Sequence, residues 1–340
     1  MTEFEGGMKQ PAPQVVDLAI VVVSYNVRDL LRRCLQSILA ALAQLQRQSY
    51  VLVVDNASQD GSAEMVQREF PGVGLIALPT NRGFAAGNNV GLRWLQQQRQ
   101  DSQWAAINVP TFGPRPRYVL LLNPDTEVVG DALAVLVGYL EQHPDVAVGG
   151  PQLRYGDGTL QSSRRRLPTV GTLFWESTLL EQWWPRNPWA RRYRYADSSQ
   201  LTAQQVEWLV GAALLVRSAA IERAGLLDER FFMYSEELEW QARLAQHGRI
   251  VYLPDAVIVH HEGKSSEQNL ARRHINFNRS KLRYARLRWG RGVAALLRCF
   301  LLLSYVVQAG IEAAKWLLGH RRALRRQRLG QYGTILRSGL

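Results

Sequence analysis

The chain contains only two cysteines, Cys34 and Cys299, and both lie in apolar segments. Two such cysteines support neither a disulfide framework nor a cysteine-based metal site. No Gly-x-Gly-x-x-Gly follows the first hydrophobic run and no Walker sequence occurs, which disfavours a dinucleotide site and a P-loop. A phosphate-bearing ligand would therefore need a cation or helix N-termini to balance its charge.

The amino-terminal segment lacks the basic and then apolar order of a signal peptide. We therefore expect a cytoplasmic protein whose residues 1–17 are extended or disordered. With 46% hydrophobic and 21% charged residues, the remainder of the chain can bury a sizeable core.

Acidic residues are almost absent from the end of the chain. Residues 271–340 contain 16 lysines and arginines and a single acid, Glu312, whereas the preceding residues contain 25 basic and 28 acidic ones. A near-neutral body with a basic tail indicates that the tail meets an anionic surface. Nucleic acid and an anionic membrane leaflet are the two candidates.

The tail also lacks a long uncharged run. Only 13 uncharged residues separate Arg298 from Glu312, fewer than the roughly 18–20 of a spanning helix. On a helical projection Arg298, Gln308, Glu312 and Lys315 share one arc, and the other positions are apolar. This pattern favours a helix at a membrane interface, with basic flanks on lipid phosphates. The alternative is a helix packed on the domain or on a second subunit of a homodimer.

Upstream of the tail, hydrophobic runs alternate with segments of helical periodicity. The predicted strands are 18–25, 50–55, 73–78, 118–122 and 146–150, and the predicted helices are 28–45, 62–70, 84–98 and 131–143. A polar, proline-containing insertion between 98 and 118 is expected to be a loop. The alternation predicts an α/β fold with a mostly parallel sheet covered by helices on both faces.

Polar residues follow four of the predicted strands: Ser24-Tyr25-Asn26, Asp55-Asn56, Asn81-Arg82-Gly83 and Asn123-Pro124-Asp125. Each group alone is more often a turn or a helix cap. Together they lie at the carboxyl edge of the sheet, where open α/β sheets bind ligands. A carboxylate at a stiff strand end suits Mg²⁺ or Mn²⁺, so Asp125 is the leading metal ligand.

The segments "VVVSYN", "VVDNASQDGS", "NRGFAAGNN" and "LLNPDTEV" resemble, in this order, the amino-terminal half of family 2 glycosyltransferases, in particular the bacterial rhamnosyltransferase-like branch. The resemblance continues through "DGTLQSSRRRLPT", "FFMYSEELEWQARL" and "VHHEGKS" and covers roughly residues 18–290. It implies a GT-A fold, a nucleotide-sugar donor, a divalent cation and an inverting single displacement.

The resemblance also implies residue roles. The nucleotide sugar would contact Ser24, Tyr25, Asn26, Asp55, Asn81, Gly83, Gly87, Asn88, Asn123 and Asp125. Asp125 would hold the metal together with His260. Many relatives carry Asp-x-Asp here, whereas this chain has Asn123 at the first position.

The second half would supply the catalytic base. Of the acidic residues in "YSEELEW", Glu237 stands where relatives carry an aspartate base, and Glu236 is its neighbour. The alternative is an acidic helix N-terminus that complements the helix dipole. Arg164, Trp184 and His261 would contact the acceptor or the diphosphate.

These expectations give a domain plan and a function. Residues 18–150 would bind the nucleotide sugar, residues 151–270 the acceptor, and residues 271–340 the cytoplasmic membrane face. The expected reaction transfers a sugar, with L-rhamnose from dTDP or UDP preferred, to a polyprenyl-linked or polysaccharide acceptor in cell-surface glycan biosynthesis. Alternatives are another donor sugar (galactofuranose, glucose or GlcNAc) and a non-catalytic nucleotide-binding relative. A processive synthase would need spanning helices and a Gln-x-x-Arg-Trp box, and a nucleic-acid-binding protein would leave the strand-end motifs unexplained.

Overall fold

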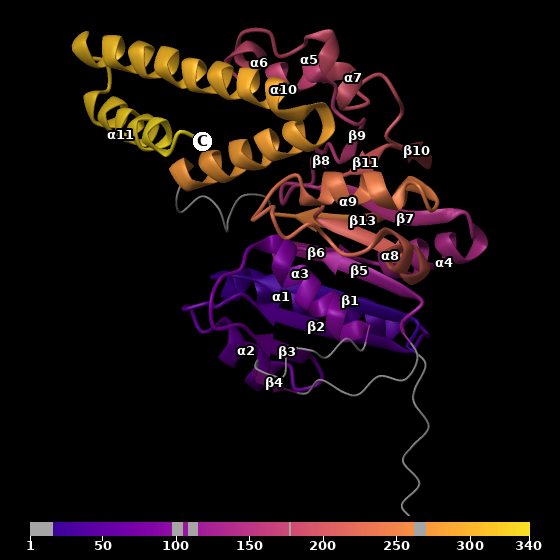
Figure 1. The fold of residues 1–340 in the computed structure, drawn as a ribbon. Helices are drawn as coiled ribbons and strands as arrows, with labels where there is room; N and C mark the ends of the chain where they lie inside the picture. The colour runs from indigo at the N-terminus through magenta and orange to yellow at the C-terminus, as the bar shows by residue number, and fades with distance from the viewer. Residues whose placement is uncertain (1–15, 97–104, 108–114, 177, 262–269) are drawn as a thin grey trace, which may run out of the picture.

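The computed structural model describes residues 16–96, 105–107, 115–176, 178–261 and 270–340. The predicted amino-terminal segment, much of the insertion between 98 and 118, and the end of "VHHEGKS" lie outside these residues. An α/β body carries a long helical hairpin at its carboxyl-terminal end (Figure 1).

The body is built on one large sheet. Among the described residues, its strands follow the order β10 (Gln204–Val206), β13 (Arg249–His260), β7 (Val146–Arg154), β12 (Ala213–Arg217), β5 (Tyr118–Leu122), β1 (Leu18–Ser24), β2 (Ser49–Asp55), β3 (Gly74–Ala77) and β4 (Ala105–Ile107). β6 (Thr126–Val129) pairs with β13, and β8 (Leu160–Gln161) pairs with β7. A separate small sheet joins β9 (Arg164–Arg165) to β11 (Trp208–Leu209).

The predicted mostly parallel sheet is confirmed. β3, β2, β1 and β5 pair in parallel, and β13 pairs in parallel with β7. β12 runs antiparallel between β5 and β7. The parallel register sets Ser24 beside Asp55, so the ends of β1 and β2 lie together.

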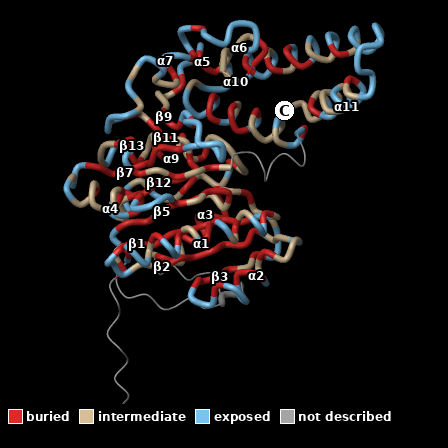
Figure 2. The backbone as a smooth tube through the Cα atoms, turned by 180° about the vertical axis from the view of Figure 1, so that it is seen from behind, coloured by how far each residue is buried: buried red, intermediate tan, exposed pale blue. Residues whose placement is uncertain are grey.

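Helices cover both faces of the sheet. Ile20 and Val22 of β1 pack in one core with α1 (Arg28–Gln44), α2 (Ser62–Glu69) and α4 (Ala132–Gln142). Val21 and Val23 face the other core, with α3 (Phe84–Leu95), α8 (Ser218–Ala224) and α9 (Glu236–Leu244). Because successive side chains of a strand point to opposite faces, this continuous apolar run needs two covering layers. Figure 2 shows the strands as the buried interior between them.

The basic tail folds into three helical segments. α10 (Leu270–Leu317) breaks at Gly290, where φ is 85°, a conformation that glycine adopts without a Cβ clash. The second half of α10 then folds back and pairs with α11 (Arg322–Ser338). Three short helices, α5 (Val170–Trp175), α6 (Leu179–Trp183) and α7 (Pro188–Tyr193), lie beside α10, and Phe174 contacts Phe300 at a centroid distance of 5.2 Å.

The polar arc predicted on the tail helix packs against α11. Glu312 is bound to Arg325 at 2.7 Å, Tyr332 donates its hydroxyl to Gln308 at 3.3 Å, and Arg298 reaches the backbone beyond α11. The sequence did not indicate this pairing. Because the polar side is covered, the apolar side of α10 faces outward.

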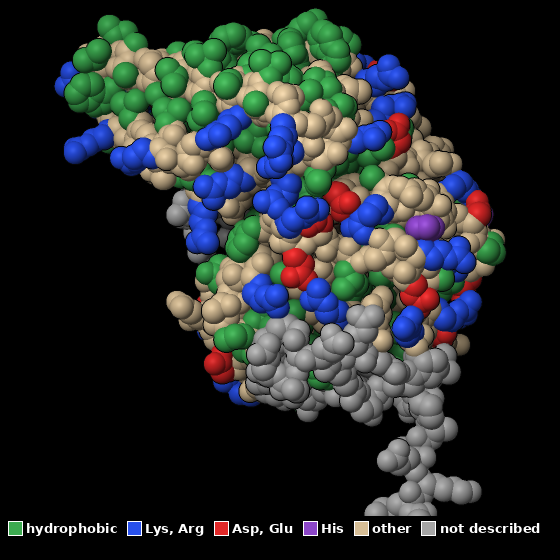
Figure 3. Space-filling view, viewed as in Figure 1, with side chains coloured by type: hydrophobic (Ala, Val, Ile, Leu, Met, Phe, Trp, Pro, Cys, Tyr) green, Lys and Arg blue, Asp and Glu red, His purple; other side chains and the backbone are tan. Residues whose placement is uncertain are grey.

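The outward side of α10 is strongly apolar. Leu296 and Leu303 are 64% and 61% exposed, and Trp183 and Trp184 of the neighbouring α6 segment are also exposed. Figure 3 shows hydrophobic side chains gathered over α10 and α6, with Lys and Arg side chains below them. An 18-residue window of α10 has a mean hydropathy of 1.8 with at most two charged residues, so by length and composition alone this helix could cross a membrane. The run of 13 residues between Arg298 and Glu312 contains no charge, whereas the longer window admits up to two charged residues. One such helix is weak support for a span, since core helices of soluble proteins have the same composition.

Candidate active site

Two adjoining cavities lie at the carboxyl edge of the parallel strands. The smaller, of about 280 Å³, is lined by Tyr25, Asn26, Asn81 and Gly83 from the ends of β1 and β3. The larger, of about 580 Å³, is lined by Glu236, Glu237 and His260. Asn123, Asp125 and Arg273 line both. Most of the residues expected from sequence therefore converge on one connected space.

Asp125 stands at the junction of the two cavities, beside His260. Asp125 Oδ1 lies 3.3 Å from His260 Nε2, and both residues are buried. The antiparallel pairing of β6 with β13 sets His260 opposite Thr126 and so brings together residues that are distant in sequence. Gln161 Oε1 lies 3.0 Å from His260 Nδ1 and fixes the imidazole from its other side. Asp125 and His260, which were predicted to act together, therefore lie close enough to contact the same ligand.

The protein supplies few ligands for a metal ion at this position. Among the described residues no group of three or more His, Cys, Asp or Glu side chains could hold a metal ion. The protein would contribute the Asp125 carboxylate, the His260 imidazole and the amide oxygen of Asn123. Mg²⁺ and Mn²⁺ commonly keep waters or take substrate phosphate oxygens, so a donor set this small is chemically compatible with either ion.

Several buried polar atoms at this edge have no partner within the described part of the chain. They are Ser24 Oγ, Asp55 Oδ1, Asn123 Oδ1, Glu236 Oε2 and Glu237 Oε2. Buried polar groups are normally hydrogen-bonded, and an unsatisfied one costs free energy. Asn123, Glu236 and Glu237 line the cavities, where a polar ligand would pair with them, whereas the predicted ligand contacts Ser24 and Asp55 line neither cavity. Burial also raises the pKa of Asp55, whose other oxygen accepts a bond from the Ser58 amide at 2.9 Å.

Glu236 and Glu237 begin α9, directly after two residues in the left-handed region, Tyr234 (φ 72°) and Ser235 (φ 64°). Burial, and then the charge of Glu237, raises the pKa of Glu236 well above its ordinary value. Burial also raises the pKa of Glu237, but backbone hydrogen bonds and the charge of Arg165 oppose this rise. Burial thus favours the protonated form of both carboxyl groups, while the charge of Arg165 favours the ionised form of Glu237.

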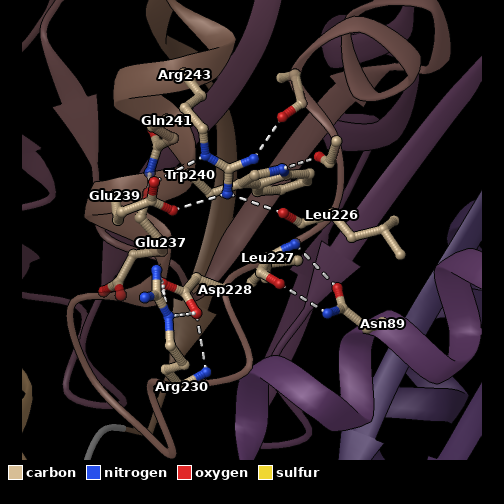
Figure 4. Close-up of polar contacts among 12 residues, drawn as sticks. Asn89, Leu226, Leu227, Asp228, Arg230, Glu237, Glu239, Trp240, Gln241 and Arg243 are labelled. Carbon is tan, nitrogen blue, oxygen red and sulfur yellow. Dashed lines mark hydrogen bonds and ion pairs between the residues drawn. The ribbon is translucent and has the colours of Figure 1, made fainter.

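Hydrogen bonds attach α9 firmly to the loop before it (Figure 4). Trp240 Nε1 donates to the Gly225 carbonyl at 2.8 Å, and Arg243 Nη2 donates to the Leu226 carbonyl at 2.8 Å. Asn89 of α3 exchanges two bonds with the backbone of Leu227, at 2.8 and 3.0 Å. The helix that carries the carboxylate pair is thereby fixed to the half of the body that carries Asp125.

Two glycines make room at the site. A Cβ on Gly83, where φ is 88°, would lie 2.3 Å from the Phe232 carbonyl oxygen, which accepts a bond from the Phe84 amide at 2.7 Å. A Cβ on Gly211 would lie 3.0 Å from Cγ of Glu237. The sequence motifs indicated Gly83 but not Gly211, because nothing in "LVGAA" shows that Glu237 lies against this glycine.

Some predicted ligand contacts lie behind the cavity wall. A Cβ on Gly87 would lie 2.7 Å from Val23 Cγ1, so this glycine allows α3 to pack closely on β1. Asn88 donates to the Phe84 carbonyl at 3.0 Å within α3 and is fully buried. Neither residue is among those that line the two cavities.

The predicted acceptor contacts Arg164, Trp184 and His261 are not brought to the cavities. Arg164 is buried and donates to the Ser199 carbonyl at 2.6 Å, and His261 Nε2 lies 2.7 Å from Glu127 Oε1. Trp184 is half exposed and contacts Trp175 at a centroid distance of 5.8 Å. Their side chains serve local packing here, so the geometry gives no support to the roles expected from sequence.

The sequence of the α/β body matches the model of a known family. The model of the family described as Glycosyl transferase family 2 matches residues 19–210, which is more than half of the chain. The chain belongs to glycosyl transferase family 2. The resemblance noted from the sequence motifs is thereby confirmed, and the chain is a glycosyltransferase.

Named relatives of this family 2 chain agree with that assignment. The N-acetylglucosaminyl-diphospho-decaprenol L-rhamnosyltransferase of Mycobacterium tuberculosis is 30% identical over 257 residues, which cover 75% of this chain and 79% of that one. Rhamnosyltransferase WbbL of Escherichia coli is 22% identical over 78% of this chain and 91% of its own length. The branch predicted from the sequence is therefore the one to which these relatives belong.

The fold expected for the family is confirmed by a solved structure. The mannosyltransferase of Pyrobaculum calidifontis, determined with GDP-Man and Mn²⁺, superposes with a TM-score of 0.51 at 17% identity, covering 96% of this chain and 87% of that one. At this identity the similarity concerns the fold alone. The α/β body is a GT-A domain, and the cavities lie at the sheet edge where such domains bind their substrates.

Proposed function

We propose that the chain is an inverting rhamnosyltransferase that transfers L-rhamnose from a dTDP- or UDP-activated donor to a lipid-linked sugar acceptor in cell-surface glycan biosynthesis. The observation that carries the proposal is the connected pair of cavities, with Asp125 at their junction and a buried carboxylate pair in the larger one. The choice of sugar and acceptor follows the named activity of the 30% identical relative.

The geometry fits a single displacement. With the nucleotide in the smaller cavity, the donor sugar extends past Asp125 towards the larger one. Glu237 takes the proton of an acceptor hydroxyl as its oxygen bonds to the anomeric carbon, and the bond from that carbon to the diphosphate oxygen breaks on the opposite face. The products are the glycosylated acceptor and a nucleoside diphosphate, with the configuration inverted.

A divalent cation, Mg²⁺ or Mn²⁺, would neutralise part of the charge on the leaving diphosphate. Asp125 and His260 would hold it, with the Asn123 amide oxygen as a neutral donor in place of a second carboxylate. Arg273 lines both cavities and would place a fixed positive charge beside the same diphosphate. The Arg273 guanidinium would thus supply part of the positive charge that the diphosphate requires.

We further propose that the outward side of α10 and the exposed tryptophans of α6 and α7 dock on an anionic membrane. Trp183, Trp184 and Trp189 are exposed beside the apolar side of α10. Tryptophan suits the interface between headgroups and acyl chains, and the basic tail complements anionic lipids. A membrane is favoured over a second subunit because the exposed apolar side chains adjoin a strongly basic segment.

The test is a panel of nucleotide sugars assayed for release of nucleoside diphosphate with a polyprenyl-diphosphate sugar as acceptor. Each donor is assayed with Mg²⁺, Mn²⁺ or EDTA. We expect dTDP- or UDP-rhamnose to give the largest kcat/KM and EDTA to reduce it. Another preferred donor would refute the rhamnosyl assignment, and a protein that binds and turns over no nucleotide sugar would refute the proposed reaction as a whole.

A further inference from the structure

One wall of the larger cavity comes from α10. The residues concerned are Leu270, Arg273, His274, Phe277, Asn278 and Tyr305. The first five recur at intervals of three and four and so share one face of the helix. The break at Gly290 returns the second half of α10 to the same cavity, where it contributes Tyr305. This wall lies outside residues 19–210, which the family model matches.

The hydroxyl of Tyr305 is held in a fixed position in this wall. Asn278 Nδ2 donates to it at 2.9 Å, and His274 Nδ1 lies 3.0 Å from it. Burial and the charge of Arg273 lower the pKa of His274, so this imidazole is neutral at pH 7. Burial raises the pKa of Tyr305, so its hydroxyl stays protonated. With Asn278 as donor and His274 as acceptor, the phenolic oxygen keeps one lone pair for a ligand hydroxyl.

An aromatic pair lies in the same cavity. The rings of Phe277 and Tyr234 meet edge to face at a centroid distance of 5.7 Å, and both residues line the space next to Glu236 and Glu237. Aromatic faces pack against the C–H faces of a pyranose, while a nearby polar group orients its hydroxyls. The wall offers both kinds of contact.

We propose that this wall of α10 is the subsite for the terminal pyranose of the acceptor, with Phe277 against the ring and Tyr305 accepting a bond from one of its hydroxyls. This inference rests on the proposed function. The α10 wall is assigned to the acceptor rather than to the donor, because the nucleotide is placed in the smaller cavity by Tyr25 and Asn26 and the donor sugar at Asp125. The acceptor hydroxyl must reach Glu237, which lines the same cavity as Phe277 and Tyr305. Phe277 and Tyr305 do not line the smaller cavity, whereas Arg273 lines both and lies towards the diphosphate.

The position of the wall also fits a lipid-linked sugar. The same hairpin presents its apolar side outward, with Leu303 only two residues from Tyr305. A lipid chain on the outer side of α10 would therefore leave its sugar close to the cavity on the inner side. Arg164, Trp184 and His261, which the sequence suggested for the acceptor, are not required.

The test compares Tyr305→Phe with Tyr332→Phe. Both substitutions remove one hydroxyl from the hairpin, but the Tyr332 hydroxyl bonds Gln308 at 3.3 Å and is not among those lining the cavity. We expect Tyr305→Phe to raise the acceptor KM about five- to tenfold, the usual effect of one lost hydrogen bond. The donor KM and the affinity for the nucleotide sugar alone, measured by calorimetry, should stay unchanged, as should all parameters of Tyr332→Phe. Phe277→Leu should raise the acceptor KM in the same manner.

Other outcomes overturn the inference. A rise in donor KM without a rise in acceptor KM would assign the wall to the donor sugar. Equal effects of both tyrosine variants would mean that the hydroxyls only stabilise the hairpin, and unchanged kinetics in Tyr305→Phe and Phe277→Leu would exclude the subsite. Failure of the proposed function is distinguishable, because the unmodified protein would then show no binding or turnover of any nucleotide sugar.

Discussion

The assignment of the base can be tested by neutralising each glutamate of the pair in turn. Glu237→Gln keeps the size of the side chain but removes the group that accepts the proton, and general-base catalysis typically contributes about 10²–10⁴-fold to the rate. We expect kcat to fall within that range. The donor KM should stay unchanged, because Glu237 lines the larger cavity and not the smaller one. Glu236→Gln copies the protonated state that burial already favours, so it should retain kcat within about fivefold, well below the loss expected for a base.

The pH dependence gives a second measurement on the same variants. Because burial raises the pKa of Glu237, the acidic limb of kcat/KM should lie above the ordinary glutamate value of about 4.3. Burial also raises the pKa of Glu236, so the folded state holds protons that the unfolded chain releases. This contribution to stability is complete below the unfolded pKa and is lost as pH rises through the folded pKa. Glu236→Gln should therefore show a smaller fall in the unfolding midpoint between pH 5 and 8, measured by thermal denaturation.

Either of two results would refute the separate roles of Glu236 and Glu237. If Glu237→Gln turns over at the unmodified rate, another group removes the proton. If Glu236→Gln loses as much activity as Glu237→Gln and the acidic limb disappears in both, the pair acts as a unit and the separate roles are wrong.

Three further predictions concern the donor site, the base and the membrane. Asp125→Ala should abolish donor binding measured by calorimetry, while the circular dichroism spectrum stays unchanged. Full retention of activity in this variant would exclude Asp125 as a ligand. Gly211→Ala places a Cβ at 3.0 Å from Glu237 Cγ, so kcat should drop about tenfold at unchanged donor KM, and a larger effect on donor KM would contradict this. Leu303→Glu should weaken binding to anionic vesicles, measured by flotation, by roughly 1–2 kcal/mol, because this apolar side chain is 61% exposed on α10. Leu201→Glu on the body, where the side chain is 78% exposed, should leave vesicle binding unchanged. Equal binding by both variants, or preferential binding to DNA at physiological salt, would refute the docking surface.

The sequence by itself determined the body of this protein. Apolar β-branched runs such as 18–25 predicted strands buried on both faces, because only a sheet covered twice can hide every side chain. Polar residues at the ends of four such runs then identified the carboxyl edge as the ligand site. Asp125 was identified in this way, whereas Glu237 was identified from the resemblance of "YSEELEW" to the family motif.

Tertiary structure alone decided which distant residues meet. The break at Gly290 brings Tyr305 to the cavity of Glu237, which no sequence motif indicated. The pairing of β6 with β13 sets His260 beside Asp125, a pairing that only the family resemblance had implied. It also turned the polar arc of the tail onto α11 and withdrew Arg164 into packing contacts. Helical periodicity shows which residues share a face but not what covers it, since the covering element is fixed by packing across the whole fold.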